Sequence, residues 1–239
     1  YDTYGKQTIR PDFSKPIGIT KSSILNKYFE ARGGKEKIEK VNALMTMGEA
    51  VLQGGAMTLN LVTIQAKPNK LSVMMLMMGN IMMKQVFNGE DGYIMQQGQK
   101  IPFPEEEKQK LISSSLPFEE LSWIDDENVT FSSVSEEDGL KQYVLKIDDK
   151  TKVFFDADSG LKTKQVTMAP TPQGEMSPQA TIYEDYREVD GILFPYLIKI
   201  PMGPQMLEFN TKEEALNYAN TNKIDFKTNI QLFQYSYKS

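Results

Sequence analysis

The chain contains no cysteine and no histidine among its 239 residues. Without cysteine it has no disulfide, no thiolate nucleophile and no zinc–thiolate site. Without histidine it lacks the imidazole base and the usual ligand of zinc or copper. These two absences exclude the commonest nucleophilic and metal-dependent mechanisms. A chain of this length buries roughly three-quarters of its unfolded surface, so it needs no disulfide to fold.

Arginine is also scarce, and positive charge is not gathered into one stretch. Only three of the 27 basic residues are arginine. The basic residues are scattered among 32 acidic residues, and the formal net charge is −5. Nucleic acid is therefore not an expected partner, because binding it requires clustered cations. The uncharged run from Leu71 to Met83 is too short for a transmembrane helix. Because the chain begins at Tyr1, we expect a processed or truncated product, in which any signal peptide or upstream domain would not be seen.

Helical periodicity starts near residue 20. Residues 1–20 contain prolines and glycines without an amphipathic pattern, which predicts an extended lead-in or linker. Thr20, Ser22 and Ser23 are possible N-caps, and Gly33-Gly34 is a stop signal. Between them, four apolar residues recur at helical spacing: Ile24, Leu25, Tyr28 and Phe29. We predict one short amphipathic helix here, followed by another helical turn at 35–40.

Beyond Val41 the apolar pattern has period two, which is typical of strands. Asn-Gly and Asp-Gly dipeptides separate many of the segments, and such dipeptides favour tight turns between antiparallel neighbours. The predicted strands are 44–52, 57–61, 71–78, 81–87, 93–97, 129–134, 140–147, 152–156, 161–168, 180–187, 192–200 and 206–209.

Two segments interrupt this succession of strands. Residues 102–116 have Pro104 near their start, three glutamates next and lysines further on, which predicts a helix. Residues 169–178 contain three prolines and one glycine, which predicts a mobile loop. The whole pattern predicts a mainly antiparallel β fold of the α+β class. We expect a curled, half-open β-barrel of about ten strands with two or three helices on its concave face.

The predicted domain covers residues 21–210 and has no internal repeat. The tail, 211–239, has a pattern that indicates a short helix and then a strand, and its packing is not predicted.

Methionine is concentrated in one part of the chain. Ten of the 14 methionines lie between Met45 and Met95, and six fall within residues 74–83. The segment 71–78 is apolar on both faces of its predicted strand, so neither face is suited to water. Methionine is flexible and polarizable, and it fills irregular cores or lines adaptable binding surfaces. The sequence leaves both interpretations open.

Three segments carry a resemblance to a known family: ILNKYFEARGGKEKIEKV (24–41), KPNKLSVMMLMMGNIMMKQVFNGEDGYI (67–94) and YEDYREVDGILFPYLIKI (183–200). With the Gly54-Gly55 turn, they resemble envelope proteins related to the outer-membrane lipoprotein carriers LolA and LolB. The resemblance is closest to Bacteroidetes-type members that form the C-terminal region of pitrilysin-like zinc peptidase chains, where a segment such as Tyr1–Gly5 leads in.

The resemblance implies an unclosed antiparallel half-barrel whose concave face takes up acyl chains. It also implies a periplasmic or cell-envelope location, and lipids or lipoproteins as partners, with a peptidase domain upstream as another. LolA-type carriers have an arginine on the sheet that holds the lid helices, whereas residues 44–52 contain none.

No catalytic or metal-binding pattern stands out. Most acidic pairs, Glu119-Glu120 among them, sit beside turn residues or in a first helical turn, where carboxylates are solvated or cap. Residues 156–167 lack the glycine at the sixth position and the glutamate at the twelfth position of a calcium loop. Catalytic motifs with phosphate-binding glycines or a nucleophile elbow are missing as well. We therefore expect no enzyme activity, no metal and no cofactor, and a hydrolase that uses carboxylates alone is the least favoured hypothesis.

The leading hypothesis is a non-catalytic carrier or binding domain for lipids, lipoprotein acyl chains or other hydrophobic ligands in a Met-lined concave groove. The alternative is a scaffold or interaction domain of a larger peptidase-like protein, with the same residues serving as ordinary core. The period-two phase assigns the following residues to the inward, ligand-binding face: Leu44, Leu52, Leu59, Leu61, Leu71, Val73, Met75, Met77, Val86, Tyr93 and Met95.

Overall fold

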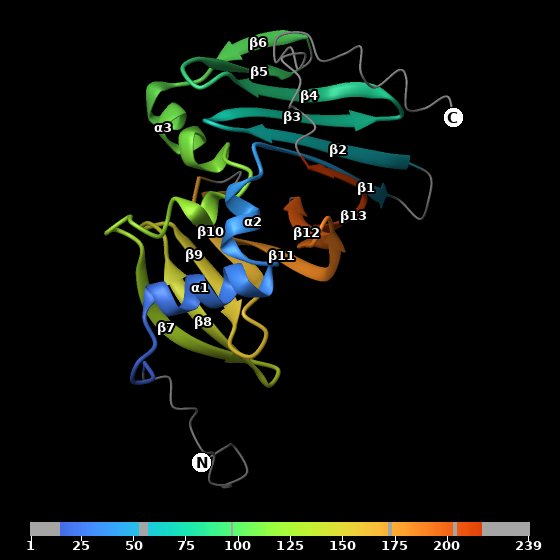
Figure 1. The fold of residues 1–239 in the computed structure, drawn as a ribbon. Coiled ribbons are helices and arrows are strands. Elements are labelled where there is room, and N and C mark those ends of the chain that lie inside the picture. The colour runs from blue at the N-terminus through green and yellow to red at the C-terminus, as the bar shows by residue number, and fades with distance from the viewer. Residues whose placement is uncertain (1–14, 53–56, 97, 172–173, 203–204, 217–239) are drawn as a thin grey trace, which may run out of the picture.

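The computed structural model describes residues 15–52, 57–96, 98–171, 174–202 and 205–216. Within these ranges, 13 antiparallel strands form one sheet in the order β6-β5-β4-β3-β2-β1-β13-β12-β11-β10-β9-β8-β7. The sheet curls without closing, since β6 and β7 remain its two edges, and the helices lie on the inner side of the curl (Figure 1). This confirms the predicted half-barrel, with more strands than expected.

The first half of the sheet follows two helices, α1 (Lys21–Ala31) and α2 (Lys35–Glu39). Its strands are β1 (Ala43–Leu52), β2 (Met57–Ala66), β3 (Lys70–Met77), β4 (Asn80–Phe87), β5 (Gly92–Gln96) and β6 (Gln99–Pro102). Helix α3 (Glu105–Ser114) and the short 3-10 helix η2 (Glu119–Leu121) come next. The second half consists of β7 (Thr130–Glu137), β8 (Leu140–Lys146), β9 (Thr151–Asp156), β10 (Lys162–Pro170), β11 (Met176–Val189), β12 (Ile192–Met202) and β13 (Gln205–Leu216).

The first helix is specified by its ends. The side chain of Thr20 accepts a hydrogen bond from the backbone N–H of Ser23, and the Ser23 hydroxyl caps Thr20 in return. At the other end the chain turns at Gly33, whose φ of 118° is unfavourable for other residues. Both predicted helix boundaries are thereby confirmed, as is the helix predicted within 102–116.

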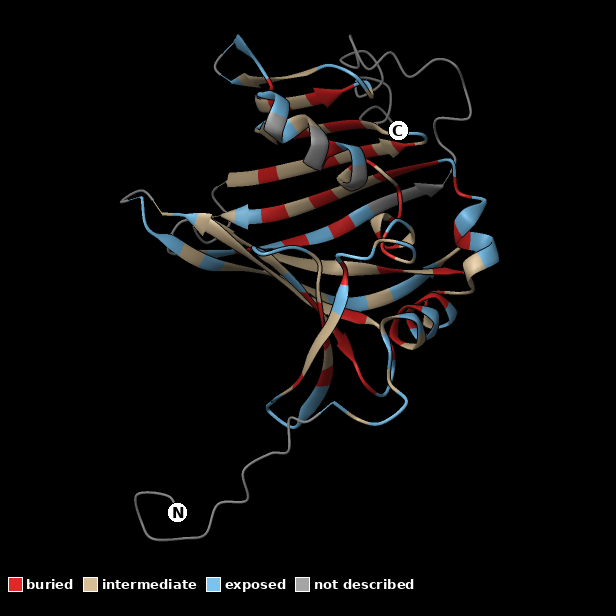
Figure 2. Ribbon diagram, turned by 90° about the vertical axis from the view of Figure 1, so that its left-hand side faces the viewer, coloured by how far each residue is buried: buried red, intermediate tan, exposed pale blue. Residues whose placement is uncertain are grey.

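The largest hydrophobic cluster lies where α1 packs against the inner face of the sheet. Tyr28 and Phe29 are fully buried, and the Tyr28 ring meets the ring of Phe155 of β9 edge-on at 5.2 Å between centroids. Buried and more exposed residues alternate along many of the strands (Figure 2), as expected for a sheet with two different faces. Helix α1 therefore anchors the interior of the second half.

The crossing from β6 to β7 links the two edges of the sheet. Helix α3 packs on β3 and β4, where Leu111 joins Leu71 and Phe87 in a buried cluster. The Gln65 side chain of β2 then donates hydrogen bonds at 2.9 Å to the carbonyls of Ser114 and Leu116. These contacts hold the crossing segment over the concave face.

The loop predicted at 169–178 is wrong at both of its ends. Strands β10 and β11 extend into it from its two ends, pairing Ala169 with Ser177 and Pro170 with Met176. The pairing of β11 with β12 reaches only as far as Ile182, which lies opposite Lys199. Before Ile182, β11 therefore pairs with β10 alone among the described strands, and the missing N–H of a proline is tolerated on its other side.

The helix predicted after residue 211 is wrong where the structure describes it. Residues up to Leu216 extend β13 and pair with β1, with Leu44 opposite Leu216. The edge of β1 supplies hydrogen-bond partners that override the helical propensity of this segment. The remaining tail, the Gly54-Gly55 turn and most of the lead-in lie outside the described residues.

Candidate functional site

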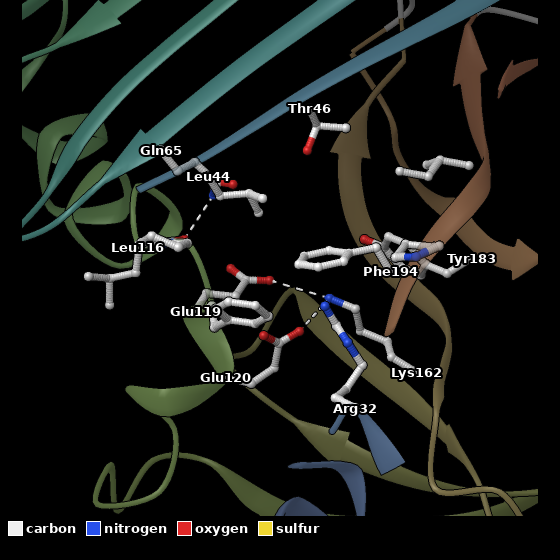
Figure 3. Close-up of a pocket in the computed structure, with 14 residues that line it drawn as sticks. Arg32, Leu44, Thr46, Gln65, Leu116, Glu119, Glu120, Lys162, Tyr183 and Phe194 are labelled. Atoms are coloured by element: carbon white, nitrogen blue, oxygen red, sulfur yellow. Dashed lines mark hydrogen bonds and ion pairs between the residues drawn. The ribbon is translucent and has the colours of Figure 1, made fainter. Parts of the chain in front are cut away.

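Three cavities lie next to one another on the concave face. The central one, of about 210 Å³, is shown in Figure 3 and is bounded by β1, β2, β10, β11, β12, η2 and the end of α1. A second, of about 170 Å³, shares Thr46, Gln65 and Ile198 with it. A third, of about 600 Å³, shares Leu116, Pro117 and Phe118 with the central cavity. We call these the central, inner and outer cavities.

The inner cavity is mainly apolar. It lies over β1, β2, β12 and β13, where Gly48 lets the Phe209 side chain approach the β1 backbone closely. Its lining residues are Thr46, Gly48, Leu61, Thr63, Gln65, Ile198, Ile200, Phe209 and Thr211.

Four charged side chains converge on the central cavity from three parts of the chain: Arg32, Glu119, Glu120 and Lys162 (Figure 3). Lys162 of β10 donates a hydrogen bond of 2.6 Å to Glu120, and its ammonium lies 4.0 Å from the Glu119 carboxylate. Glu120, Lys162 and Arg32 are all buried. Charges removed from water in this way are stable only when they are paired, so this cluster is a constrained feature of the fold.

Arg32 is placed by the end of α1. Its carbonyl accepts a hydrogen bond of 2.8 Å from the backbone N–H of Leu193, which ties the helix end to the start of β12. The next residue, Gly33, touches the turn before β12, where an added Cβ would lie 2.1 Å from the Gly191 oxygen. The close approach of α1 to this turn therefore depends on glycine at position 33.

The guanidinium of Arg32 is surrounded by aromatic rings. It lies 5.0 to 5.8 Å from the ring centroids of Tyr28, Phe118, Tyr186 and Phe194. It also donates a hydrogen bond of 2.5 Å to the Tyr28 hydroxyl. Its Nε atom is buried and has no hydrogen-bond partner in the part of the chain that the structure describes. Arg32 thus contributes a guanidinium that is held by aromatic rings to the lining of the central cavity.

Burial raises the pKa of the Glu119 carboxyl from 4.5 to about 7, although Lys162 opposes this change. Burial also raises the pKa of Glu120, but Lys162 and Arg32 outweigh that effect and the net change is downward. Burial lowers the pKa of the Lys162 ammonium, but the attraction of Glu120 outweighs this effect, and the net pKa is raised. Near neutral pH the cluster therefore holds two cations, one firmly ionised carboxylate and one carboxyl close to its titration point.

The structure brings eight of the 11 predicted site residues to the concave face. Leu44 lines the central cavity and Leu61 the inner one. Leu52, Leu59, Leu61, Met75 and Met77 pack together in one cluster with Phe209, while Leu71 and Val73 lie under α3. Among the residues described as lining the three cavities there is no methionine. A ligand-binding role for these eight residues stays a prediction.

The predicted inward placement of Val86, Tyr93 and Met95 is wrong. A β-bulge between Met75 and Leu76 in the β3–β4 pairing shifts the register by one residue. Val86 consequently lies opposite Ser72, and Tyr93 lies opposite Val86, on the other face of the sheet. A shift of one residue exchanges the two faces of a strand, which explains all three errors.

The charged cluster was not predicted from the sequence. Glu119 and Glu120 stand in the first turn of the short helix η2, but Glu120 is only 3% exposed, so the expectation that such carboxylates are solvated or serve as caps is wrong for it. Arg32 could have been suspected as one of only three arginines, placed directly before the Gly-Gly stop. Nothing in the local sequence marks Lys162 among the other lysines.

The sequence matches no protein-family model and no curated protein. By structure, the chain is similar to a LolA superfamily protein from Nitrosomonas europaea, with a TM-score of 0.54 and 14% identity over 83% of this chain and 94% of that one. It is also similar to a DUF1329 family protein from Desulfovibrio piger, with a TM-score of 0.51 and 9% identity over 82% and 92% of the two chains. At such identities the likeness establishes the fold, a LolA-like half-barrel.

No helix among the described residues is long and apolar enough to cross a membrane. Within the same residues, no group of three or more acidic side chains is arranged to hold a metal ion.

Proposed function

We propose that this protein is a non-catalytic binding or carrier domain for lipids or other acyl-chain ligands, which it holds on the concave face of the half-barrel. The observation that carries the proposal is the row of three adjoining cavities between the sheet and the α3–η2 crossing. The likeness to a LolA superfamily fold supports it.

An acyl chain needs little directional contact to bind in such a place. Burial of each methylene stabilises the complex by about 0.8 kcal/mol before the cost of ordering the ligand. The inner cavity offers Leu61, Ile198, Ile200 and Phe209 as apolar surface. Its mouth toward the central cavity is partly polar, with Thr46 and Gln65. This arrangement suits an amphiphile better than a fully apolar molecule.

The proposal includes a place in the cell envelope, with a lipid, a lipoprotein or an upstream peptidase domain of the same chain as partner. It also retains the methionines of β3 as part of the binding surface. Met75 and Met77 lie on the concave face next to Leu59 and Leu61, where flexible side chains would adapt to a longer ligand.

The scaffold alternative predicts a concave face filled by its own side chains. The three adjoining hollows support the carrier proposal, because a concave face filled by its own side chains would leave no such space beside the α3–η2 crossing.

The test is a titration of delipidated, refolded protein with the fluorescent fatty acid 11-(dansylamino)undecanoic acid, together with native mass spectrometry of the protein before delipidation. The proposal predicts a saturable rise in dansyl fluorescence that oleate reverses, and a co-purified lipid mass. A folded protein that shows neither signal would support the scaffold alternative.

A further inference from the structure

The central cavity combines two cations with the entrance to an apolar cavity. Arg32 and Lys162 both line it, and both are more than nine-tenths buried. Buried cations do not improve the binding of an uncharged acyl chain, and removing them from water costs free energy on folding. Their position next to Thr46 and Ile198, which continue into the inner cavity, therefore indicates a ligand with a charged end and an apolar end.

We propose that the central cavity binds the carboxylate head of a single-chain amphiphile, a fatty acid or fatty acyl acid, whose acyl chain lies in the inner cavity. This assignment rests on the proposed function and names the chemical class of its ligand.

The charge of the cluster fits a single carboxylate. Arg32 and Lys162 carry two positive charges, and Glu120 carries one negative charge, held by its 2.6 Å hydrogen bond to Lys162. When Glu119 is protonated, the cluster has one net positive charge, which one carboxylate neutralises. When Glu119 is ionised, the cluster is already neutral and a further anion is less welcome.

The donor geometry also fits. Arg32 lines the central cavity, and a guanidinium offers its N–H groups in a planar fork that matches a carboxylate. The four aromatic rings and the Tyr28 hydroxyl hold this guanidinium in place before a ligand arrives. A preorganised donor loses less entropy on binding.

The site also predicts a dependence on pH. The groups that interact with Glu119 are Lys162 of β10, Glu120 of η2 and Tyr183 of β11, and Arg32, Tyr28 and Tyr186 interact in turn with Glu120. Because burial raises the pKa of the Tyr183 and Tyr186 hydroxyls, both stay neutral near pH 7. Glu119 is thus the group whose charge changes there. A bound carboxylate favours its protonated form, so affinity for a fatty acid falls as pH rises through about 7.

The experiment compares decanoate with uncharged 1-decanol by isothermal titration calorimetry. Wild-type protein is expected to bind decanoate roughly tenfold more tightly than decanol near pH 6.5, and to lose most of that preference near pH 8.5. Arg32→Met should remove the preference while decanol still binds. Arg187→Met is the matched control, since Arg187 is exposed and paired with Asp185.

Glu119→Gln provides a second variant, in case Arg32→Met fails to fold. It should bind decanoate tightly at both pH values, because the cluster then keeps its net positive charge. If wild type binds decanol and decanoate equally at both pH values, the head-group assignment is wrong and the proposed function survives. If it binds neither amphiphile, both are wrong.

Discussion

The ammonium group of Lys162 lies 2.6 Å from the Glu120 carboxylate inside the concave face of the half-barrel, between β10 and the 3-10 helix η2. The side chains are 10% and 4% exposed, so water screens this ion pair little. The two residues are 42 positions apart in the chain. The crossing segment between β6 and β7 joins the two edges of the sheet, and this ion pair holds it against the second half of the sheet.

Loss of this pair should destabilise the protein strongly. Lys162→Met leaves Glu120 buried with only Arg32 nearby to offset its charge, and we expect a loss of about 3 kcal/mol in the free energy of unfolding. Lys146→Met is the matched control, because Lys146 is 42% exposed and pairs with the exposed Asp149. That change should cost less than about 1 kcal/mol. Urea unfolding followed by the fluorescence of Trp123 measures both, and equal losses would contradict the account.

Stability should fall as pH rises through neutrality. The pKa of Glu119 is raised by burial to about 7, so its contribution is fully present below its unfolded value of 4.5 and is lost as pH rises through 7. Because the Glu119 side chain is 27% exposed and water partly screens it, we expect a decrease of about 1 to 2 kcal/mol between pH 4.5 and 8. Because the chain has no histidine, few other side chains titrate in this window.

Urea unfolding at several pH values tests this prediction. Glu119→Gln should flatten the decline, whereas Glu137→Gln, at a side chain that is 58% exposed, should leave it unchanged. A wild-type protein whose stability is constant from pH 5 to about 8 would show that Glu119 titrates normally.

Alanine substitutions at the neighbouring Gly33 and Gly34 distinguish the cost of backbone strain from the cost of a steric clash. Both have positive φ, but an added Cβ at Gly33 would lie 2.1 Å from the Gly191 oxygen, whereas at Gly34 it would meet nothing within 4 Å. Gly34→Ala should cost about 1 to 2 kcal/mol, because an L-residue is strained at a φ of 104°. Gly33→Ala should cost about 3 kcal/mol or more, since α1 and the β12 turn must move apart.

Chemical unfolding of the two variants distinguishes these effects. The Gly33 variant should also weaken decanoate binding, because Arg32 is displaced with the end of α1. Similar costs for the two variants would mean that the close approach at Gly33 does not hold the helix.

The hydrophobic pattern and the turn signals were enough to predict the half-barrel and the first helix. The Thr20 cap, the Ile24 to Phe29 spacing and the Gly33 stop are local signals, and local signals predict local structure. The inward phase was correct as far as Met77 and then failed. The bulge opposite Met75 and Leu76 inserts one residue into β4, and no turn dipeptide or change of composition marks it.

The charged cluster was beyond sequence reasoning for a different reason. Arg32, Glu120 and Lys162 meet only because three distant segments pack together, and each of them alone has the sequence context of a surface residue. Strand β13 illustrates the same limit, since its pairing with β1 joins the two halves of the sheet and overrides a helical pattern in residues 211–216.

The central claim is that the concave cavities bind an acyl chain, and one substitution tests it most directly. Thr46 borders both the central and the inner cavity, so Thr46→Phe should fill the passage between them. Thr130→Phe, at the exposed start of β7, is the matched control. In the dansyl fatty acid titration, wild type and Thr130→Phe should bind alike, and Thr46→Phe should lose about tenfold or more in affinity while remaining folded. Undiminished binding by folded Thr46→Phe would contradict the account.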